Sequence, residues 1–255
     1  MIRFLFTIPM YNLFFGIGII CGILMFYHLC KKEEIPTKNV DSILILLVIA
    51  LLAAFVSSAL FDNLVHGRFK SDEGFFSGFT FYGGLLMSSF IIVIGCFIVF
   101  KDSLKVYRML NILSVCLVLG HAFGRIGCFL GGCCYGLETN SIFGFVFPVY
   151  DINGLVVDHH KVLPTQLYES VFLFVLFVFL YRDLKNAFIK YLIGYGTFRF
   201  LLEFLRGDER GVLFTNILHP SQFVSMLLIS TGIVLLILKK KNVILKNTSV
   251  PDLPP

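Results

Sequence analysis

Arg125 lies inside the segment 121–136, HAFGRIGCFLGGCCYG, at the end of a long apolar run. An arginine at the edge of a bilayer costs about 3 kcal/mol or more, so it usually faces the protein interior and meets an anion or a carboxylate. Its guanidinium carries a fork of N–H donors that matches a phosphate group. His121 lies four residues earlier, on the same face of a helix, where an imidazole can accept a proton. Together the two residues predict an anion site with a base beside it.

A second set of reactive side chains occupies the segment 194–211, GYGTFRFLLEFLRGDERG. On a helix, the spacing of four places Tyr195, Arg199 and Glu203 on one face. Arg206 follows three residues after Glu203 and is predicted to share that face. An Arg199–Glu203 pair that only neutralises itself is the alternative interpretation. Because the second arginine leaves an excess of positive charge, we predict an anionic ligand, and a phospholipid phosphate is the anion most available there.

Three cysteines follow Arg125 closely, namely Cys128, Cys133 and Cys134. Thiols are zinc ligands, but the spacing C-x4-C-C lacks the C-x2-C pair typical of structural zinc sites. We therefore predict no metal and no other cofactor. A disulfide or buried thiols are favoured, and the pairing cannot be read from the sequence.

The segments that must position these residues are apolar enough to be membrane helices. Of the 255 residues, 57% are hydrophobic and 15% are charged, whereas about a quarter of a soluble domain is charged. This composition predicts an all-α integral membrane protein with a single polytopic domain over 1–241. The interval 128–164 is predicted to be a loop region on the outer face, and 242–255 a disordered cytoplasmic tail. Seven transmembrane helices are predicted, at 10–30, 42–62, 78–100, 107–124, 166–183, 188–206 and 219–238.

Basic residues predict the orientation of these helices. The segments after the first, third, fifth and seventh helices hold most of the 21 lysines and arginines. Because positive residues mark the cytoplasmic side, the N-terminus is predicted outside and the C-terminus in the cytoplasm. Four polar segments then reach the outer face, at 82–84, 121–136, 164–169 and 199–210. We therefore predict a buried site that opens outward.

Glu169, close to the start of the predicted fifth helix, has two interpretations. It is either a second carboxylate in this site or an interfacial residue that meets Thr165 at the helix start.

The stretch 124–136, GRIGCFLGGCCYG, resembles the signature of bacterial prolipoprotein diacylglyceryl transferases, whose form is G-R-x-G-N-F-x-N-x-E-x-x-G. Further segments match the family in the same order, namely IPMY at 8–11, FYGGLL at 81–86, LPTQLYE at 163–169 and YGTFRFLLEFLR at 195–206. The resemblance covers most of the chain. The family's seven spans with an outside N-terminus agree with the topology inferred above.

The resemblance implies a multi-pass enzyme of the bacterial cytoplasmic membrane with an outward-facing active site. Such an enzyme takes the diacylglyceryl group from phosphatidylglycerol, places it on the lipobox cysteine thiol of a prolipoprotein and releases glycerol phosphate. Its partners are these two substrates and membrane lipids, with no nucleic acid. Arg125 and Arg199 match the family's essential arginines. The implied substrate-binding residues are Tyr11, Gly83, Gly84, Gly124, Gly127, Gly136, Gln166, Glu169, Tyr195, Glu203 and Arg206.

The chain departs from the family pattern at several positions, three of which bear on the chemistry. Tyr82 occupies the place of the histidine in a His-Gly-Gly motif, Cys128 replaces an asparagine and Cys133 replaces a glutamate. Because that histidine has a functional role in the family, the identity of the base stays open. Catalytic roles are predicted for His121 and Tyr82. His121 is the favoured proton acceptor, since a neutral tyrosine with a pKa of about 10 is a poor base at neutral pH.

Two alternative functions stay open. A paralogous transferase could deliver a lipid group to a different thiol, hydroxyl or glycan acceptor. A phospholipid-binding membrane protein or a transporter could hold headgroups without chemistry, although the sequence shows no Gly/Pro-broken spans repeated in two halves. Release of glycerol phosphate distinguishes an enzyme from a binder.

Overall fold

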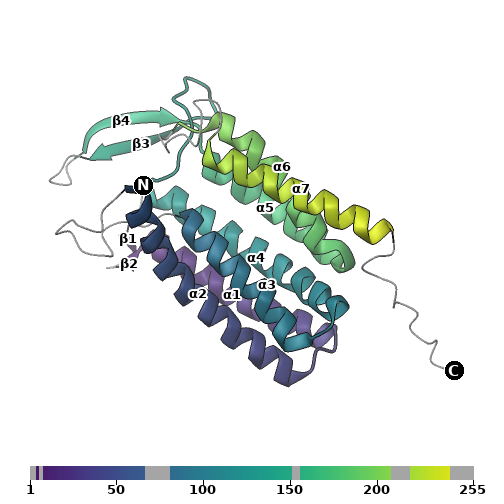
Figure 1. Ribbon diagram of the computed structural model, residues 1–255. Coiled ribbons are helices and arrows are strands. Elements are labelled where there is room, and N and C mark those ends of the chain that lie inside the picture. The colour runs from purple at the N-terminus through teal and green to yellow at the C-terminus, as the bar shows by residue number, and fades with distance from the viewer. Residues whose placement is uncertain (1–3, 6–7, 67–80, 151–155, 208–218, 242–255) are drawn as a thin grey trace. The chain divides into compact units, whose positions relative to one another are not determined.

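The structure is a computed structural model that describes residues 4–5, 8–66, 81–150, 156–207 and 219–241. It is mostly helical (Figure 1). The helices are α1 (Met10–Lys32), α2 (Thr37–His66), α3 (Phe81–Phe100), α4 (Ser103–Gly131), α5 (Thr165–Arg182), α6 (Ala187–Leu202) and α7 (Pro220–Lys240), with the 3-10 helices η2 (Leu184–Asn186) and η3 (Glu203–Leu205). The strands are β1 (Phe4–Leu5), β2 (Ile8–Pro9), β3 (Phe145–Tyr150) and β4 (Val156–Val162), paired as antiparallel hairpins. The predicted disordered tail, 242–255, lies outside the described residues.

Within the described ranges, 6 helices are long and apolar enough to cross a membrane, namely α1 to α5 and α7. The protein is therefore a multi-pass, mostly helical membrane protein, as its composition predicts. Helix α6 is shorter, with 16 residues. The sequence predicted a longer sixth helix, over 188–206, but the chain changes to the 3-10 helix η3 after Leu202.

Helix α4 is longer than predicted. The fourth span was expected to end at 124, whereas α4 continues to Gly131. Arg125 and Cys128 therefore lie on the helix. The chain leaves it through Gly132, whose φ of 72° is in the left-handed region that glycine adopts readily.

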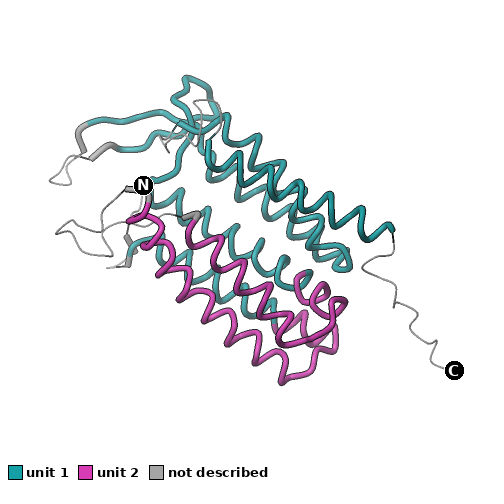
Figure 2. Tube along the Cα trace, viewed as in Figure 1, with its two compact units in different colours: residues 1–26, 111–255 teal, residues 27–110 magenta. Residues whose placement is uncertain are grey.

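The chain divides into two compact units (Figure 2). Residues 1–26 and 111–255 form the first unit, and residues 27–110 form the second. Helices α1 and α4 each contribute to both units.

In the second unit, α2 and α3 pack closely at two glycines. A Cβ atom at Gly83 would lie 2.5 Å from Phe61 Cβ and 2.6 Å from the Ser57 carbonyl oxygen, so the contact requires glycine. The Ser57 hydroxyl also donates a hydrogen bond to the Gly83 carbonyl oxygen at 3.1 Å. A Cβ atom at Gly84 would lie 3.0 Å from the Ala54 carbonyl oxygen. Both glycines, expected at the substrate site, thus have a packing role.

In the first unit, buried polar side chains join the helices. The Ser170 hydroxyl on α5 donates to the Ala122 carbonyl oxygen of α4 at 3.0 Å. Asn111 of α4 accepts a bond from the Phe188 N–H at 2.9 Å and donates to the Lys185 carbonyl oxygen at 3.3 Å. Because a buried polar group costs free energy unless it is hydrogen-bonded, these contacts hold α4 against α5 and the start of α6.

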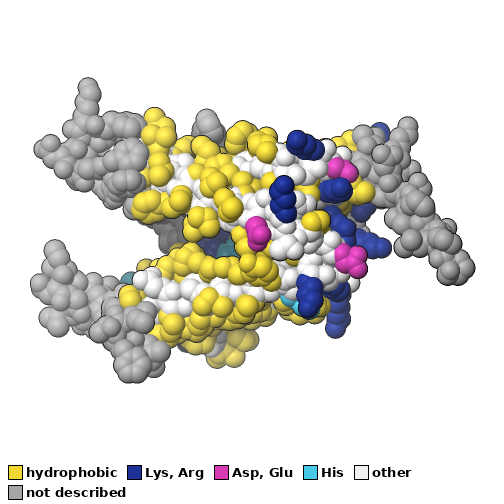
Figure 3. All heavy atoms as spheres, turned by 90° about the horizontal axis from the view of Figure 1, so that it is seen from below, with side chains coloured by type: hydrophobic (Ala, Val, Ile, Leu, Met, Phe, Trp, Pro, Cys, Tyr) yellow, Lys and Arg dark blue, Asp and Glu magenta, His cyan; other side chains and the backbone are white. Residues whose placement is uncertain are grey.

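On the face drawn in Figure 3, basic side chains gather apart from the exposed hydrophobic side chains. In the second unit, Arg108 near the start of α4 donates from Nε to Glu33 Oε2 at 2.8 Å. In the first unit, Lys239 at the end of α7 donates to the Asn186 side chain in η2. These are the basic clusters on which the predicted orientation rests.

The predicted outer loop region, 128–164, contains the hairpin β3–β4. Its register places Phe145 opposite Val162, and its strand sequences FVFPVY and VVDHHKV are rich in residues that favour strands. The sequence predicted only a loop region here, and the structure adds this hairpin, whose strands have 6 and 7 residues.

Gly136 lies where three segments of this region meet. Its N–H donates to the Leu163 carbonyl oxygen at 2.8 Å, and it forms a β-bridge with Arg206. A Cβ atom here would lie 2.5 Å from the Leu205 carbonyl oxygen and 2.7 Å from Thr165 Cγ2. The position therefore has room only for glycine.

Gly136→Ala should lower the free energy of unfolding by about 1–3 kcal/mol, the usual cost of overpacking, because the Leu205 carbonyl cannot move away without breaking the bridge. Thermal unfolding in detergent measures the effect. Gly16→Ala is the matched control, since a Cβ atom at Gly16 meets nothing within 4 Å, and it should leave the melting temperature unchanged or raised. Equal stability of the two variants would show that the segment adjusts without cost.

Candidate active site

The carboxylate of Glu169, on α5, is the centre of a buried polar network. Its side chain is 0% exposed. Arg125 of α4 holds it, with Nη2 lying 3.0 Å from Oε1 and 2.9 Å from Oε2. A buried carboxylate without a partner would cost several kcal/mol, so the ion pair fixes α4 against α5.

Two more side chains contact Glu169. The Tyr195 hydroxyl of α6 donates to Oε1 at 2.9 Å, and His121 Nε2 lies 3.7 Å from the same oxygen. The rings of His121 and Tyr195 meet edge to face, with centroids 5.4 Å apart. The network therefore joins α4, α5 and α6.

A second ion pair lies one turn farther along the sixth helix. Arg199 Nη1 is 2.7 Å from Glu203 Oε2, and both side chains are buried. Arg199 also interacts electrostatically with Glu169, so the two ion pairs belong to one set of charges. Within the described residues, the buried Nε of Arg125 has no hydrogen-bond acceptor. Since buried donors are nearly always paired, this N–H is available to a ligand.

Arg206 does not share the helical face of Arg199, so that prediction is wrong. Helix α6 ends at Leu202, η3 follows, and Arg206 has an extended backbone with φ −85° and ψ 140°. Its side chain is buried, and its guanidinium forms a hydrogen bond with the Cys134 sulfur. The bridge to Gly136 draws the chain out of the helix before position 206. Spacing along a helix could not reveal that bridge.

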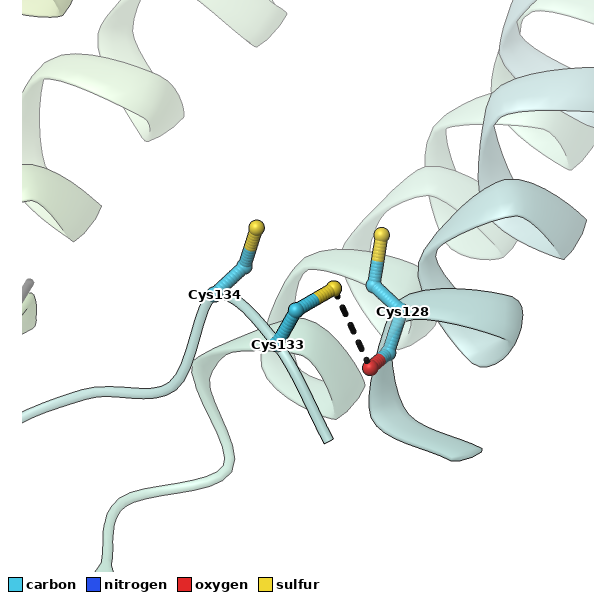
Figure 4. A group of neighbouring side chains, drawn as sticks. All are labelled: Cys128, Cys133 and Cys134. Carbon is cyan, nitrogen blue, oxygen red and sulfur yellow. Dashed lines mark hydrogen bonds between the residues drawn. The ribbon is translucent and has the colours of Figure 1, made fainter. Parts of the chain in front are cut away.

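Cys128, Cys133 and Cys134 lie together (Figure 4), and Arg206 bonds to the last of them. Their sulfur atoms are all within 4.8 Å of one another, and all three are free thiols. Hydrogen bonds from the Cys128 and Cys133 thiols, together with the Arg206 guanidinium, lower the pKa of Cys134. Donation of hydrogen bonds to Cys128 and Cys134 raises the pKa of Cys133. Of Cys133 and Cys134, Cys134 therefore loses its thiol proton first.

Comparison with known proteins shows to which family the chain belongs. Residues 1–238 match the family model described as prolipoprotein diacylglyceryl transferase. The chain belongs to the prolipoprotein diacylglyceryl transferase family. It is 30% identical over 237 residues to phosphatidylglycerol–prolipoprotein diacylglyceryl transferase 2 of Clostridium perfringens, covering 88% of each chain. A phosphatidylglycerol–prolipoprotein diacylglyceryl transferase of Finegoldia magna is 32% identical over 249 residues, 92% of each chain. One of Clostridium tetani is 30% identical over 236 residues, 88% of this chain and 90% of its own.

In this member of the prolipoprotein diacylglyceryl transferase family, most polar residues singled out in the sequence meet in one network. The residues of this network are His121, Arg125, Glu169, Tyr195, Arg199 and Glu203. Of the two interpretations of Glu169, the contact with Arg125 places it inside the network. Gln166 lies close by, but its amide donates to the Cys133 carbonyl oxygen at 2.6 Å. It therefore holds the cysteine segment in place.

The aromatic and glycine positions of this family member have different surroundings. Tyr11, at the start of α1, is partly exposed and stacks on Phe15 with ring centroids 6.2 Å apart. A Cβ atom at Gly127 would lie 3.1 Å from the Tyr11 carbonyl oxygen, so Gly127 lets α1 approach α4. A Cβ atom at Gly124 meets nothing within 4 Å. Gly124 thus leaves open space one residue from Arg125.

Tyr82, Gly83 and Gly84 lie in the first turn of α3, in the second unit. The two glycines pack on α2. The side chain of Tyr82 lies outside the described part of the chain, so its catalytic role stays a prediction.

Two further residues, one beside the network and one beside the cysteine segment, were assigned no site role from the sequence. The Tyr191 ring stacks on Tyr195 with centroids 5.6 Å apart, and the Thr165 hydroxyl donates to the Cys134 carbonyl oxygen at 3.0 Å. The spacing of four that connects Tyr195 with Arg199 also connects Tyr191 with Tyr195, so this signal was present. The Thr165 bond joins segments far apart in the chain and has no local signal.

Glu169→Gln should destabilise the protein by about 3–5 kcal/mol, because it leaves the Arg125 charge buried without a carboxylate. Tyr195→Phe keeps the ion pair and removes one hydrogen bond to a charged group, which should cost about 1.5–3 kcal/mol. Tyr191→Phe is the matched control and should have little effect. The readout is the midpoint of thermal unfolding in one detergent. A Glu169→Gln variant as stable as the wild type would mean that the carboxylate is not an ionised partner of Arg125.

Proposed function

We propose that this protein transfers the diacylglyceryl group of phosphatidylglycerol to the cysteine thiol of a prolipoprotein lipobox and releases glycerol phosphate. The observation that carries the proposal is a pair of arginines, the half-buried Arg125 and the buried Arg199, held by Glu169 and Glu203. The membership of the chain in the transferase family and the activity that the names of its relatives state support the same conclusion.

Arg125 and Arg199 are assigned to the lipid phosphate. Each guanidinium is held by its own carboxylate, so its position is set before substrate binds. The Arg125 Nε–H, without an acceptor among the described residues, supplies a free donor. Negative charge grows on the phosphate as the bond from glyceryl carbon to phosphate oxygen breaks, and pre-aligned cations stabilise that charge.

His121 is assigned as the proton acceptor. Its side chain is 27% exposed, whereas that of Glu169 is 0% exposed, so of the two the imidazole can meet an incoming thiol. It takes the thiol proton, because the thiolate is the nucleophile. The sulfur–carbon bond to the glyceryl group forms, and glycerol phosphate leaves with the electrons of the broken carbon–oxygen bond. Glu169, 3.7 Å from the imidazole, stabilises its charged form.

The decisive assay combines the purified protein with phosphatidylglycerol and a lipobox peptide. We expect a thioether-linked diacylglyceryl peptide by mass spectrometry and an equal amount of glycerol phosphate. A peptide with serine in place of the lipobox cysteine is the control and should remain unmodified. Lipid binding without release of glycerol phosphate would assign the protein to the phospholipid binders, and release with another acceptor would assign it to a paralogous transferase.

Arg125→Lys and Arg199→Lys should each lower the rate of transfer by at least about 100-fold, because an ammonium group cannot reproduce the bidentate fork. Arg108→Lys is the matched control, since Arg108 lies on the same helix as Arg125 but pairs with Glu33, and its activity should stay near that of the wild type. The initial rate with the lipobox peptide is the measurement. Near-normal activity of Arg199→Lys would show that charge alone suffices.

In the proposed topology the chain crosses the membrane seven times, with α6 as one of the spans. The N-terminus is outside, the C-terminus is in the cytoplasm and the site faces outward. A membrane-impermeant alkylating reagent should then label His159→Cys in intact spheroplasts but not Asp102→Cys or Lys185→Cys. The background should carry Cys133→Ser and Cys134→Ser to remove native labelling. All positions should react after permeabilisation. Labelling of position 102 and not 159 before permeabilisation would reverse the orientation.

A further inference from the structure

The cysteine cluster has no part in the proposed reaction, in which the acceptor supplies the thiol. Its sulfur atoms, from Cys128, Cys133 and Cys134, lie within 4.8 Å of one another, and the side chains point toward one common space (Figure 4). A zinc ion with sulfur ligands about 2.3 Å away has those sulfurs about 4 Å apart. Side-chain rotations alone can therefore close the cluster around one ion.

The backbone explains how the spacing C-x4-C-C assembles three ligands. Cys128 lies in the last turn of α4, and Gly132 then reverses the chain with a φ of 72°. Cys133 returns over the helix end, where its N–H donates to the Cys128 carbonyl oxygen at 3.2 Å. Cys134 has a φ of 65°, a left-handed conformation that residues other than glycine rarely adopt. The helical turn and this reversal together bring the three sulfurs to one place.

Two residues of α5 hold the reversed segment in position. The Thr165 hydroxyl donates to the Cys134 carbonyl oxygen at 3.0 Å, and the Gln166 amide donates to the Cys133 carbonyl oxygen at 2.6 Å. Both side chains are buried. Because these bonds hold the cysteines by their backbone, the sulfurs remain available as ligands at positions fixed in advance.

The charges around the cluster suit bound thiolates. Arg206 bonds to the Cys134 sulfur, and Arg125 interacts electrostatically with Cys128. A divalent cation bound by three thiolates carries one net negative charge, and positive side chains close by can compensate it. The two guanidinium groups supply that compensation.

We propose that Cys128, Cys133 and Cys134 form a three-thiolate binding site for a thiophilic cation of the zinc class. With three protein ligands, a tetrahedral ion keeps its fourth position for a water molecule or an external ligand. The competing use of these residues is a disulfide, which would join two sulfurs and leave the third unused. The proposal is independent of the proposed transfer reaction, because binding is measured without lipid or acceptor.

The test is a titration of the full chain, purified in detergent, reduced and freed of metal, with Cd²⁺ as the probe. The thiolate-to-cadmium charge-transfer absorption should rise and saturate at one ion per chain, and Zn²⁺ should reverse it. Cys128→Ser, Cys133→Ser and Cys134→Ser should each weaken binding by more than about 100-fold, the upper range for changes outside the ligand shell. Cys21→Ala and Cys116→Ala are the matched controls and should bind as the wild type does.

A second measurement requires no variant and so does not depend on the folding of any substitution. One equivalent of Zn²⁺ should protect Cys128, Cys133 and Cys134 of the wild type from alkylation, mapped by mass spectrometry, while Cys21 reacts equally with and without the ion. The absence of saturable Cd²⁺ binding, a charge-transfer band that persists in the serine variants, or equal alkylation of the three thiols with and without Zn²⁺ would each overturn the proposal.

Discussion

The rest of the site depends on the buried ion pair between Arg125 and Glu169. One charge comes from α4 and the other from α5, and removing either would leave the other in apolar surroundings at a cost of several kcal/mol. The same carboxylate accepts the Tyr195 hydroxyl, which brings in α6 and with it the Arg199–Glu203 pair. The cationic groups are therefore positioned by the packing of three helices rather than by a loop. Rigid placement of this kind suits a site that must stabilise developing negative charge without rearranging.

Most of the helical fold could be predicted, because the requirement for about twenty apolar residues in a membrane span is a local property of the sequence. The two misplaced helix ends have non-local causes. Arg125 and its neighbouring glycines suggested that α4 stops at 124, but a carboxylate from α5 compensates the arginine and the helix continues to Gly131. The apolar pattern beyond Leu202 suggested a longer α6, but there the chain pairs with Gly136 and leaves the helix.

Which residues belong to the site was easier to predict than which of them contact one another. The spacing of four places His121 with Arg125, and Arg199 with Glu203, because neighbours on a helix face are fixed by its geometry. Glu169 pairs with Arg125 on another helix, and no local pattern in the sequence indicates that partner. The sequence alone therefore left two interpretations of Glu169. The cysteines show the same limit. Their spacing along the chain did not reveal their proximity, which follows from a helix end and two residues with positive φ, Gly132 and Cys134.

The shortness of α6 has a consequence for how a lipid reaches the arginines. Its 16 residues rise about 24 Å at 1.5 Å per residue, whereas a hydrocarbon core is about 30 Å thick. If α6 begins at one boundary of the core, it ends before the other, and η3 occupies the remaining depth. Irregular backbone at that depth must have its polar groups bonded within the protein, as in the Gly136–Arg206 bridge and the bond from the Leu137 N–H to the Leu205 carbonyl oxygen. In the proposed orientation, the guanidinium groups would lie beneath the headgroup layer, so that a phospholipid would bring its phosphate down to them while both acyl chains stay dissolved in the bilayer.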